Sequence, residues 1–372
     1  MKRALVIVSV ACAGALMSSC GLEKPDEAEG RCTLVLHAVD TSGVYTEEWQ
    51  GVAGANVEVT SATFAYKRLF TTDDTGRIVL EGLPSGDYYI QASMRDEERN
   101  VLLTGQRKKI LRSESEAKDT LFLSFVPMSP IVINELYYAG CNGSSFYYYD
   151  QFIELYNSTS DTLYLDGCVV CRSQQSDGLI DLEAEDFALA YYMYQFPGTR
   201  GITRLCPIEP GGFLVLACDA INHRNYGALC VNLLSADWEF FNPTQNDYDN
   251  LSVPNILPVS TVGKDFTMSL GHTAILLATG EEYTFAEYTT SSGVSPFIQV
   301  PLRTVLDAVE VANNQSPTFR RYWTLRIDAG LGGNGMPKYG GQSIERKVPG
   351  FDSNNSSFDF EIVGSPTPGY SH

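Results

Sequence analysis

Six cysteines cluster in the middle of the chain and could form either disulfides or a zinc site. They are Cys141, Cys168, Cys171, Cys206, Cys218 and Cys230. In an oxidising compartment they predict up to three disulfides, and the sequence leaves their pairing open. The alternative is a zinc site built on Cys168 and Cys171, with Cys218, His223 or Cys230 as further ligands. A single Cys-x-x-Cys pair is a weak zinc signal, so the sequence favours disulfides and we expect no bound metal.

Side chains suited to acid–base catalysis are sparse. The four histidines, His37, His223, His272 and His372, lie far apart and form no metal-hydrolase motif. Glu135, Glu154 and Asn157 lie near the ends of expected strands, where a catalytic carboxylate pair is one interpretation. Hydrogen bonding between strands is the favoured one, because no His, Lys or metal-ligand cluster accompanies these residues. We therefore expect a protein that is not an enzyme and uses no cofactor.

Aromatic side chains gather at several places and could bind a partner or stack on sugar rings. Tyr and Trp in loops bury much area at a low entropic cost. The three tyrosines at 147–149 cannot all face one core from a strand, because successive side chains alternate between faces. The candidate contact residues are Tyr147, Tyr148, Tyr149, Tyr191, Tyr192, Tyr194 and Trp238. The alternative interpretation is that these rings simply cover the core.

Composition and charge narrow the classes of partner. The chain has 372 residues with 26 Lys and Arg against 45 Asp and Glu, a net charge of −19. We expect no nucleic-acid partner, because phosphate binding needs clustered basic residues. The acidic runs at 181–186 and 246–250 lack a calcium-loop pattern and are interpreted as solvated surface. The glycine-rich stretch at 328–335 is expected to be a mobile loop.

The N-terminus has the pattern of a secretory signal. Lys2 and Arg3 precede an apolar run at 4–16, which is shorter than the roughly 20 residues that span a bilayer. Small residues then lead to Cys20. This pattern resembles the lipobox of bacterial lipoproteins, which implies a signal peptide at 1–19 and acylation of Cys20, for example with palmitate. The lipid chains would anchor the protein to a membrane.

An acidic, proline-containing tether is expected at 20–30. It is similar to the export signal that surface-exposed lipoproteins of Bacteroidota carry after the lipidated cysteine. The resemblance implies an outer-membrane location with the protein facing outward.

Residues 31–126 predict a small antiparallel β-sandwich. Short runs alternate between apolar and polar residues and are separated by turn residues such as Asp74-Thr75-Gly76 and Pro84-Ser85-Gly86. The stretches at 52–59, 72–78 and 83–90 resemble the carboxypeptidase-regulatory-like, transthyretin-like sandwich. That family implies a spacer or docking platform without catalysis.

Residues 131–372 predict a second sandwich, which begins after two prolines at 127–130. An Asn-Glu strand at 131–136, a Glu-Leu-Tyr-Asn strand at 152–157 and a terminal Pro-Gly resemble the immunoglobulin-like lamin-tail domain. Long loop insertions are expected at about 172–204 and 219–267.

The fold class we predict is all-β, with two antiparallel, immunoglobulin-like β-sandwich domains in tandem. The whole arrangement resembles a Bacteroidota lipoprotein family of unknown function. We expect a non-catalytic accessory or ligand-capturing subunit that partners an outer-membrane, TonB-dependent β-barrel protein through the two insertions. The alternative is a surface adhesin or structural module that binds glycans or host proteins. Asp-Thr-aliphatic sequences also make Thr120 and Thr162 candidate O-glycosylation sites.

Overall fold

The computed structural model describes residues 32–61, 66–96, 101–112, 116–126, 129–142, 147–173, 180–260, 265–290, 293–315 and 320–370. The predicted signal peptide, Cys20 and the acidic tether lie outside the described residues. Across the described ranges, we find no helix with the length and apolar character needed to cross a membrane.

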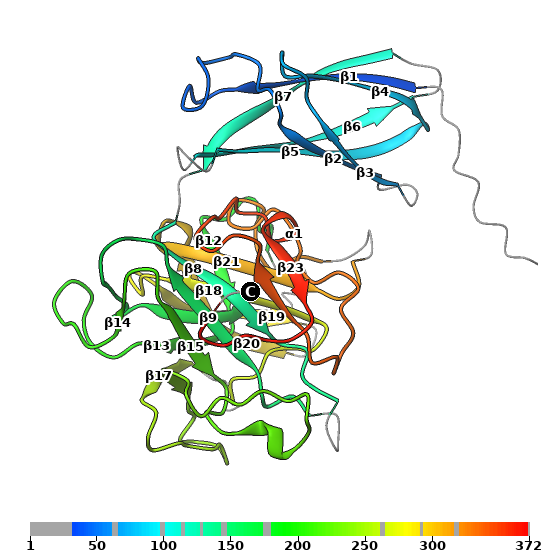
Figure 1. Ribbon diagram of the computed structural model, residues 1–372. Helices are drawn as coiled ribbons and strands as arrows, with labels where there is room; N and C mark the ends of the chain where they lie inside the picture. Colours follow the sequence, from blue (N-terminus) through cyan, green and yellow to red (C-terminus); the bar gives the residue numbers. More distant parts are fainter. Residues whose placement is uncertain are drawn as a thin grey trace, which may run out of the picture.

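The first domain is a seven-stranded sheet that curls around one core (Figure 1). In spatial order its strands are β3 (Lys67–Thr71), β2 (Asn56–Ser61), β5 (Gly86–Asp96), β6 (Val101–Leu111), β7 (Glu116–Val126), β1 (Cys32–Asp40) and β4 (Arg77–Leu83). Alternate residues of β1 and β2, among them Leu34, Leu36, Val57 and Val59, point into this core. Most neighbours are antiparallel, but β1 and β7 run parallel.

The second domain is built on an eleven-stranded sheet. In spatial order its strands are β21 (Val305–Ala312), β18 (His272–Ala278), β11 (Val169–Ser173), β13 (Tyr192–Gln195), β17 (Asn255–Ser260), β16 (Trp238–Phe240), β15 (Phe213–Ala217), β9 (Phe152–Asn157), β8 (Ile131–Tyr137), β22 (Ser343–Arg346) and β23 (Phe360–Val363). Strands from both halves of this order contribute to one core, which contains Ile133, Leu216, Phe240, Ile275 and Val309. The sheet therefore curls back on itself.

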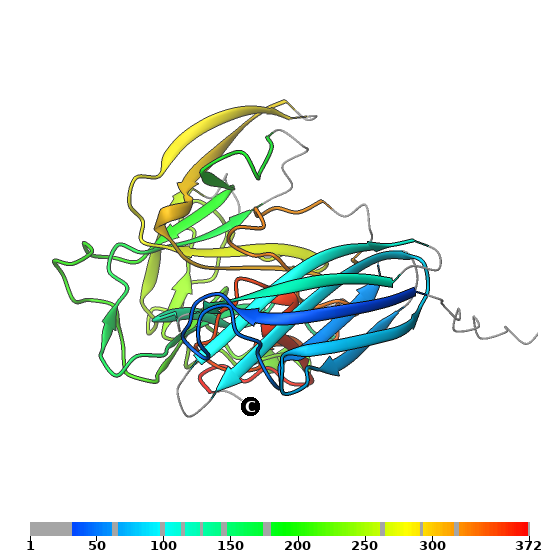
Figure 2. The same ribbon diagram turned by 90° about the horizontal axis from the view of Figure 1, so that it is seen from above.

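Two further layers cover the outside of this curled sheet. The sheet of β12 (Phe187–Ala190), β20 (Gly293–Pro301) and β19 (Thr284–Thr290) packs over β11, β18 and β21, and its β19–β20 hairpin projects from the domain (Figure 2). The segment at 220–253 covers β8, β9 and β15 and contains the short helix η1 (His223–Asn225). The remaining elements are β10 (Leu163–Tyr164), β14 (Pro207–Ile208), η2 (Leu302–Thr304) and α1 (Ser356–Asp359).

The prediction of an all-β fold is confirmed, but two local expectations were wrong. The segments expected as loop insertions supply β12 and β13 in the first case, and β16 and β17 in the second, because their apolar residues complete the core. The glycine-rich stretch is not a free loop: Gly332 bonds through its backbone to Glu310 and Ala312 of β21. Deleting the second insertion would therefore break the sheet rather than remove a contact surface alone.

Candidate binding surface

Four tyrosines from two distant segments form a stacked cluster, which we call the tyrosine surface: Tyr147, Tyr148, Tyr149 and Tyr226. The Tyr147 and Tyr226 rings stack with centroids 4.5 Å apart, and the Tyr148 and Tyr149 rings stack at 4.6 Å. Tyr149 and Tyr226 keep 38% and 45% of their surface exposed. Tyrosine offers a large, rigid contact area of this kind at many protein interfaces.

The buried His223 side chain holds the tyrosine surface in place from the protein interior. Its ring is fully buried, the Tyr147 hydroxyl lies 2.9 Å from Nδ1, and Nε2 lies 2.8 Å from the Asp219 carbonyl oxygen. A carbonyl can only accept, so Nε2 carries the proton and Nδ1 accepts from Tyr147. Burial lowers the His223 pKa to about 4, so the imidazole is neutral near pH 7. The Tyr147 ring is thus held in place by a fully satisfied histidine.

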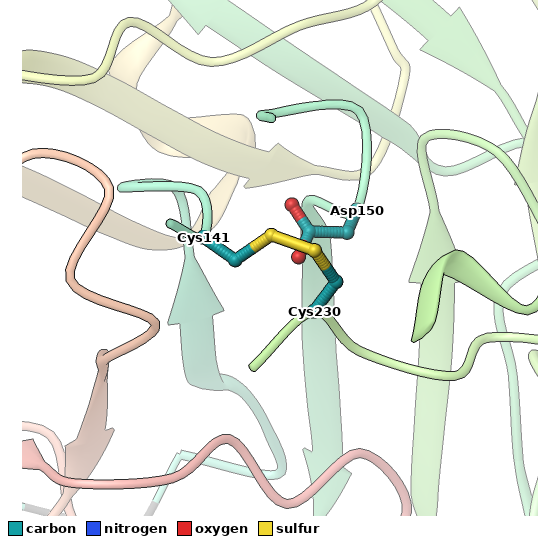
Figure 3. A group of neighbouring side chains, drawn as sticks. All are labelled: Cys141, Asp150 and Cys230. Carbon is teal, nitrogen blue, oxygen red and sulfur yellow. A yellow bond between two sulfur atoms is a disulfide. The ribbon is translucent and has the colours of Figure 1, made fainter. Parts of the chain in front are cut away.

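A disulfide joins the two segments that carry these tyrosines. Cys141, which follows β8, bonds to Cys230, which follows η1, across 89 residues (Figure 3). The Cys141 backbone N–H donates to the Tyr147 carbonyl oxygen at 2.8 Å. The covalent link and this hydrogen bond therefore fix Cys141 and Tyr147 against the 220–253 segment, where Tyr147 meets Tyr226.

The same place holds the one described group of side chains that could together hold a metal ion: Cys141, Asp150 and Cys230 (Figure 3). Its two sulfurs are bonded to each other and are not available as thiolate ligands. Asp150 instead accepts hydrogen bonds from the Tyr137 hydroxyl and the Val231 N–H. The arrangement is therefore structural in the oxidised protein.

Carboxyl groups flank the tyrosine surface. The hydrogen bond with the Tyr148 hydroxyl and burial raise the pKa of Tyr149 to about 12, with smaller contributions from nearby Asp265 and Asp219. Burial, together with nearby Asp247, Glu239 and Asp265, raises the pKa of Asp219 to about 8. A partner with hydrogen-bonding groups beside its apolar contact would suit this surface.

Several predicted contact residues are instead part of the core. Tyr192, Tyr194 and Trp238 are 2%, 0% and 9% exposed, because they point inward from β13 and β16. Tyr191 is half-buried against Phe297. The prediction was wrong for the three buried rings, whereas Tyr147, Tyr148 and Tyr149 lie together at the surface. Tyr226 was missed, because a single tyrosine in a polar stretch carries no sequence signal.

The cysteine predictions were correct for Cys141 and Cys230 only. Cys168, Cys171, Cys206 and Cys218 are buried free thiols, so they form no disulfides. Cys168 and Cys171 belong to different cores, on opposite faces of the sheet, since three residues along a strand reverse the face. The two thiols can neither bond to each other nor bind a common zinc ion in this fold.

The two glutamates singled out from the sequence, Glu135 and Glu154, lie in one row with Glu345 across three neighbouring strands. Register places Glu135 opposite Glu154 on one side and Glu345 on the other. Glu135 accepts hydrogen bonds from Ser343 and from the Thr367 backbone. Glu154 accepts from Asn134 and from the Gly369 backbone N–H. These carboxyl groups bind the C-terminal segment to the sheet, as the hydrogen-bonding interpretation expected.

We expect the protonation of Glu135 and Glu154 to make the stability of the fold depend on pH. Burial raises the pKa of Glu135 and of Glu154 to about 8, despite their hydrogen bonds. The folded state thus keeps protons that the unfolded chain, with ordinary values near 4.5, has lost. Stability contributed in this way is fully present at low pH and falls between about pH 5 and 8, by up to ~1.4 kcal/mol per pH unit and group.

Glu135→Gln should flatten this dependence, because the amide cannot ionise. The measurement is urea unfolding of wild type and variant at pH 5, 6.5 and 8. Equal slopes of unfolding free energy against pH in the two proteins would contradict the assignment.

The two candidate glycosylation sites differ in their surroundings. Thr120 lies on β7 and is half-buried beside Asp119, which pairs with Lys109. Thr162 is also half-buried, and its hydroxyl donates to Glu209 at 2.9 Å. Modification at either residue stays a prediction.

The comparisons with known proteins concern the second domain and the overall fold. Residues 209–367 match the family described as "Protein of unknown function (DUF4876)". A crystal structure of a DUF4876 family protein from Bacteroides thetaiotaomicron is 21% identical, covers 89% of this chain and 94% of that chain, and has a TM-score of 0.54. This similarity shows that the two chains share a fold. No curated protein matches the chain.

Two other solved structures have much lower similarity. A proposed carbohydrate-binding protein from Pseudomonas aeruginosa is 17% identical, covers 26% of this chain and 90% of that chain, and has a TM-score of 0.20. A streptococcal ancillary pilin is 12% identical, covers 48% of this chain and 57% of that chain, and has a TM-score of 0.21. Neither similarity supports an inference about this chain.

Proposed function

We propose that this protein is a lipid-anchored, outward-facing protein of the outer membrane that binds a β-barrel partner in the same membrane. It acts as an accessory or ligand-capturing subunit, and a TonB-dependent transporter is the specific partner class. Cys20 carries the anchor, and the tyrosine surface makes the contact. The observation that carries the proposal is the stacked, partly exposed tyrosine cluster held in place by a disulfide and a buried histidine.

Preorganisation makes the tyrosine surface suited to binding. Ordering a flexible side chain on association costs about 0.5–1.5 kcal/mol, and rings already held by stacking avoid most of that cost. Tyr226 stacks on Tyr147, whose hydroxyl is bound to His223. Fixed aromatic rings of this kind are frequent hot spots in protein interfaces.

The buried acidic groups support binding rather than catalysis. The Glu135 and Glu154 side chains are buried, and both accept hydrogen bonds from the C-terminal segment. A substrate would have to displace that segment to reach them. These carboxylates therefore serve the fold.

The test is affinity purification of the tagged full-length protein from gently solubilised outer membranes of its native host. Wild-type protein should recover a β-barrel partner in stoichiometric amount. The double variant Tyr149→Ala/Tyr226→Ala should lose it, because two hot-spot rings together contribute at least 2 kcal/mol, or about 30-fold in affinity.

Phe285→Ala is the matched control, since Phe285 is an exposed aromatic residue, 63% accessible, on the projecting β19–β20 hairpin. It should retain the partner. Recovery of the wild-type protein alone would contradict the proposal and favour a free-standing surface adhesin.

A further inference from the structure

A cleft of about 880 Å³ lies between the two domains, away from the tyrosine surface. Its volume falls in the range of about 300–1,000 Å³ that is typical of ligand sites. The domains touch beside it, where the Arg95 guanidinium lies over the Phe351 ring at 4.9 Å. The cleft therefore has one wall from each domain.

The first wall is the outer face of β2, β5 and β6. Because side chains two residues apart share a face, the strand register arranges the lining residues in two rows. One row runs Glu58, Gln91 and Gln106, and the other runs Thr60, Tyr89 and Lys108. This wall thus offers a carboxylate, two amides, a hydroxyl, an ammonium group and an aromatic ring, and Tyr89, which carries the ring, is 51% exposed.

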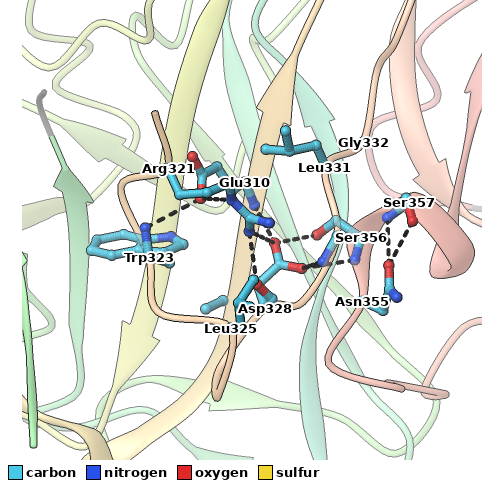
Figure 4. Close-up of polar contacts among 12 residues, drawn as sticks. Glu310, Arg321, Trp323, Leu325, Asp328, Leu331, Gly332, Asn355, Ser356 and Ser357 are labelled. Carbon is cyan, nitrogen blue, oxygen red and sulfur yellow. Dashed lines mark hydrogen bonds and ion pairs between the residues drawn. The ribbon is translucent and has the colours of Figure 1, made fainter. Parts of the chain in front are cut away.

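The opposite wall is formed by the glycine-rich stretch and the loop before α1. It presents Leu331, Gly332, Asn355 and Ser357, which are labelled in Figure 4. Gly333 and Asn334 also line it. At Gly333, where φ is +72°, a Cβ atom would lie 2.4 Å from the Tyr138 hydroxyl, so the backbone packs too closely for a side chain. The wall therefore combines backbone and amide groups with apolar side chains, among them Leu325, Leu331 and Ile362.

Buried charges behind this wall hold it rigid. Asp328 accepts from the backbone N–H groups of Gly330 and Ser356, at 3.1 and 2.8 Å, and from the Ser356 hydroxyl (Figure 4). Arg321 donates to the Asp328 carbonyl at 2.7 Å and to Glu310 at 2.8 Å. A wall fixed in this way loses little freedom when a ligand binds.

The two lining cations of the first wall, Arg107 and Lys108, are paired with carboxylates. Lys108 pairs with Asp87 at 3.1 Å, and Arg107 pairs with Asp119 at 3.0 Å. The lining amides each combine donors and an acceptor, which suits the hydroxyl groups of a sugar. The Lys108 ammonium lies over one face of the exposed Tyr89 ring, 5.5 Å from its centroid, so the other face is the one on which a sugar ring can stack. Glu58 and Glu361 add carboxylates to the lining, which disfavours an anion, and carboxylates also accept hydrogen bonds from hydroxyl groups. The chemistry of the cleft therefore suits a neutral, hydroxyl-rich ligand better than an anion.

We propose that the cleft between the two domains binds a neutral oligosaccharide. Tyr89 stacks on a sugar ring, Gln91 and Gln106 bond its hydroxyls from the first domain, and Asn334 bonds them from the second. This site is separate from the tyrosine surface and does not depend on it.

A glycan array of neutral and acidic oligosaccharides, probed with the full-length protein in detergent micelles, tests the proposal. Binding should occur to neutral members, and calorimetric titration with the strongest binder should give one site per chain. Tyr89→Ala and Gln91→Ala should each weaken that binding at least tenfold. Asn334→Ala should do so as well, because the ligand contacts both domains.

Two controls separate this site from other surfaces. Phe122→Ala removes an exposed aromatic residue, 48% accessible, from β7 outside the cleft, and it should leave glycan affinity unchanged. Tyr149→Ala/Tyr226→Ala should also bind glycan with wild-type affinity. Loss of the β-barrel partner in this variant can therefore be distinguished from loss of glycan binding. Absence of neutral-glycan binding, binding confined to acidic glycans, or wild-type affinity in Tyr89→Ala and Gln91→Ala would each overturn the proposal.

Discussion

Replacing Arg346 with methionine should lower the free energy of unfolding by about 3–5 kcal/mol, because it leaves buried carboxylates without their cation. The Arg346 side chain is 1% exposed and forms ion pairs with Asp307 at 2.8 Å, with Asp359 at 3.3 Å and with Asp352 at 3.5 Å. Its Nε donates to the Ile133 carbonyl oxygen at 2.8 Å.

The position of Arg346 explains why this loss should be large. Asp307 on β21 accepts from the Ile133 N–H on β8 at 2.6 Å and from Arg346 on β22. The three residues therefore close the seam where the curled sheet meets itself. Removing the guanidinium opens that seam and leaves Asp307 buried beside Asp352 and Asp359.

The loss should also depend on pH. Burial raises the pKa of Asp307 to about 7 even with Arg346 present. Without the cation, the aspartates can take up protons at pH 5 but face a larger cost of burial as anions at pH 8. Urea unfolding of Arg346→Met should therefore show a greater loss of stability at pH 8 than at pH 5.

Arg326→Met is the matched control. Arg326 forms an ion pair with Asp186 at 2.9 Å, but these side chains are 42% and 93% exposed. Exposed pairs contribute about 0–1 kcal/mol, so this variant should unfold nearly as wild type does. Equal losses in the two variants would show that Arg346 contributes no more than a surface ion pair.

Removing the Cys141–Cys230 disulfide should lower the free energy of unfolding by about 2–5 kcal/mol. The bond closes a loop across 89 residues, so its absence would free a long segment in the unfolded chain. The double variant Cys141→Ala/Cys230→Ala should show this loss in denaturant unfolding under oxidising conditions. A reducing agent should bring wild type down to the level of the variant.

Cys218→Ala controls for the loss of a buried sulfur, since Cys218 is a buried free thiol. Cys218→Ala should lower the free energy of unfolding by less than the double variant does. The difference between Cys218→Ala and wild type should be the same with and without the reducing agent. A wild-type protein that unfolds identically with and without reductant would show that the disulfide adds nothing to stability. Limited proteolysis of the reduced protein should cut first beside Tyr147, Tyr148 and Tyr149, because the tyrosine surface is no longer covalently fixed.

The sequence by itself determined the features that depend on local periodicity. Alternating residues such as Leu34 and Leu36 indicated strands, because a strand with one buried face needs that pattern whatever its neighbours are. The tyrosines at 147–149 could be placed partly at the surface for the same reason. The all-β class therefore follows from the order of residues alone.

The tertiary structure decided which distant residues meet. Cys141 could have paired with any of five other cysteines, and only the packing of the 220–253 segment over β8 and β9 selects Cys230. The same packing brings Tyr226 to Tyr147. Nothing in the local sequence encodes either contact.

Curling of the sheet similarly determined that the expected insertions form strands. Tyr194 and Trp238 lie in segments that read as loops, but the sheet needs their rings to fill its core. The cleft likewise exists only because two folded domains meet, and its first wall is a polar strand face that the sequence shows as ordinary solvated surface. The local sequence pattern determines which side of a strand is apolar. Closure of the sheet then determines what packs against the apolar side, and docking of the domains determines what the polar side faces.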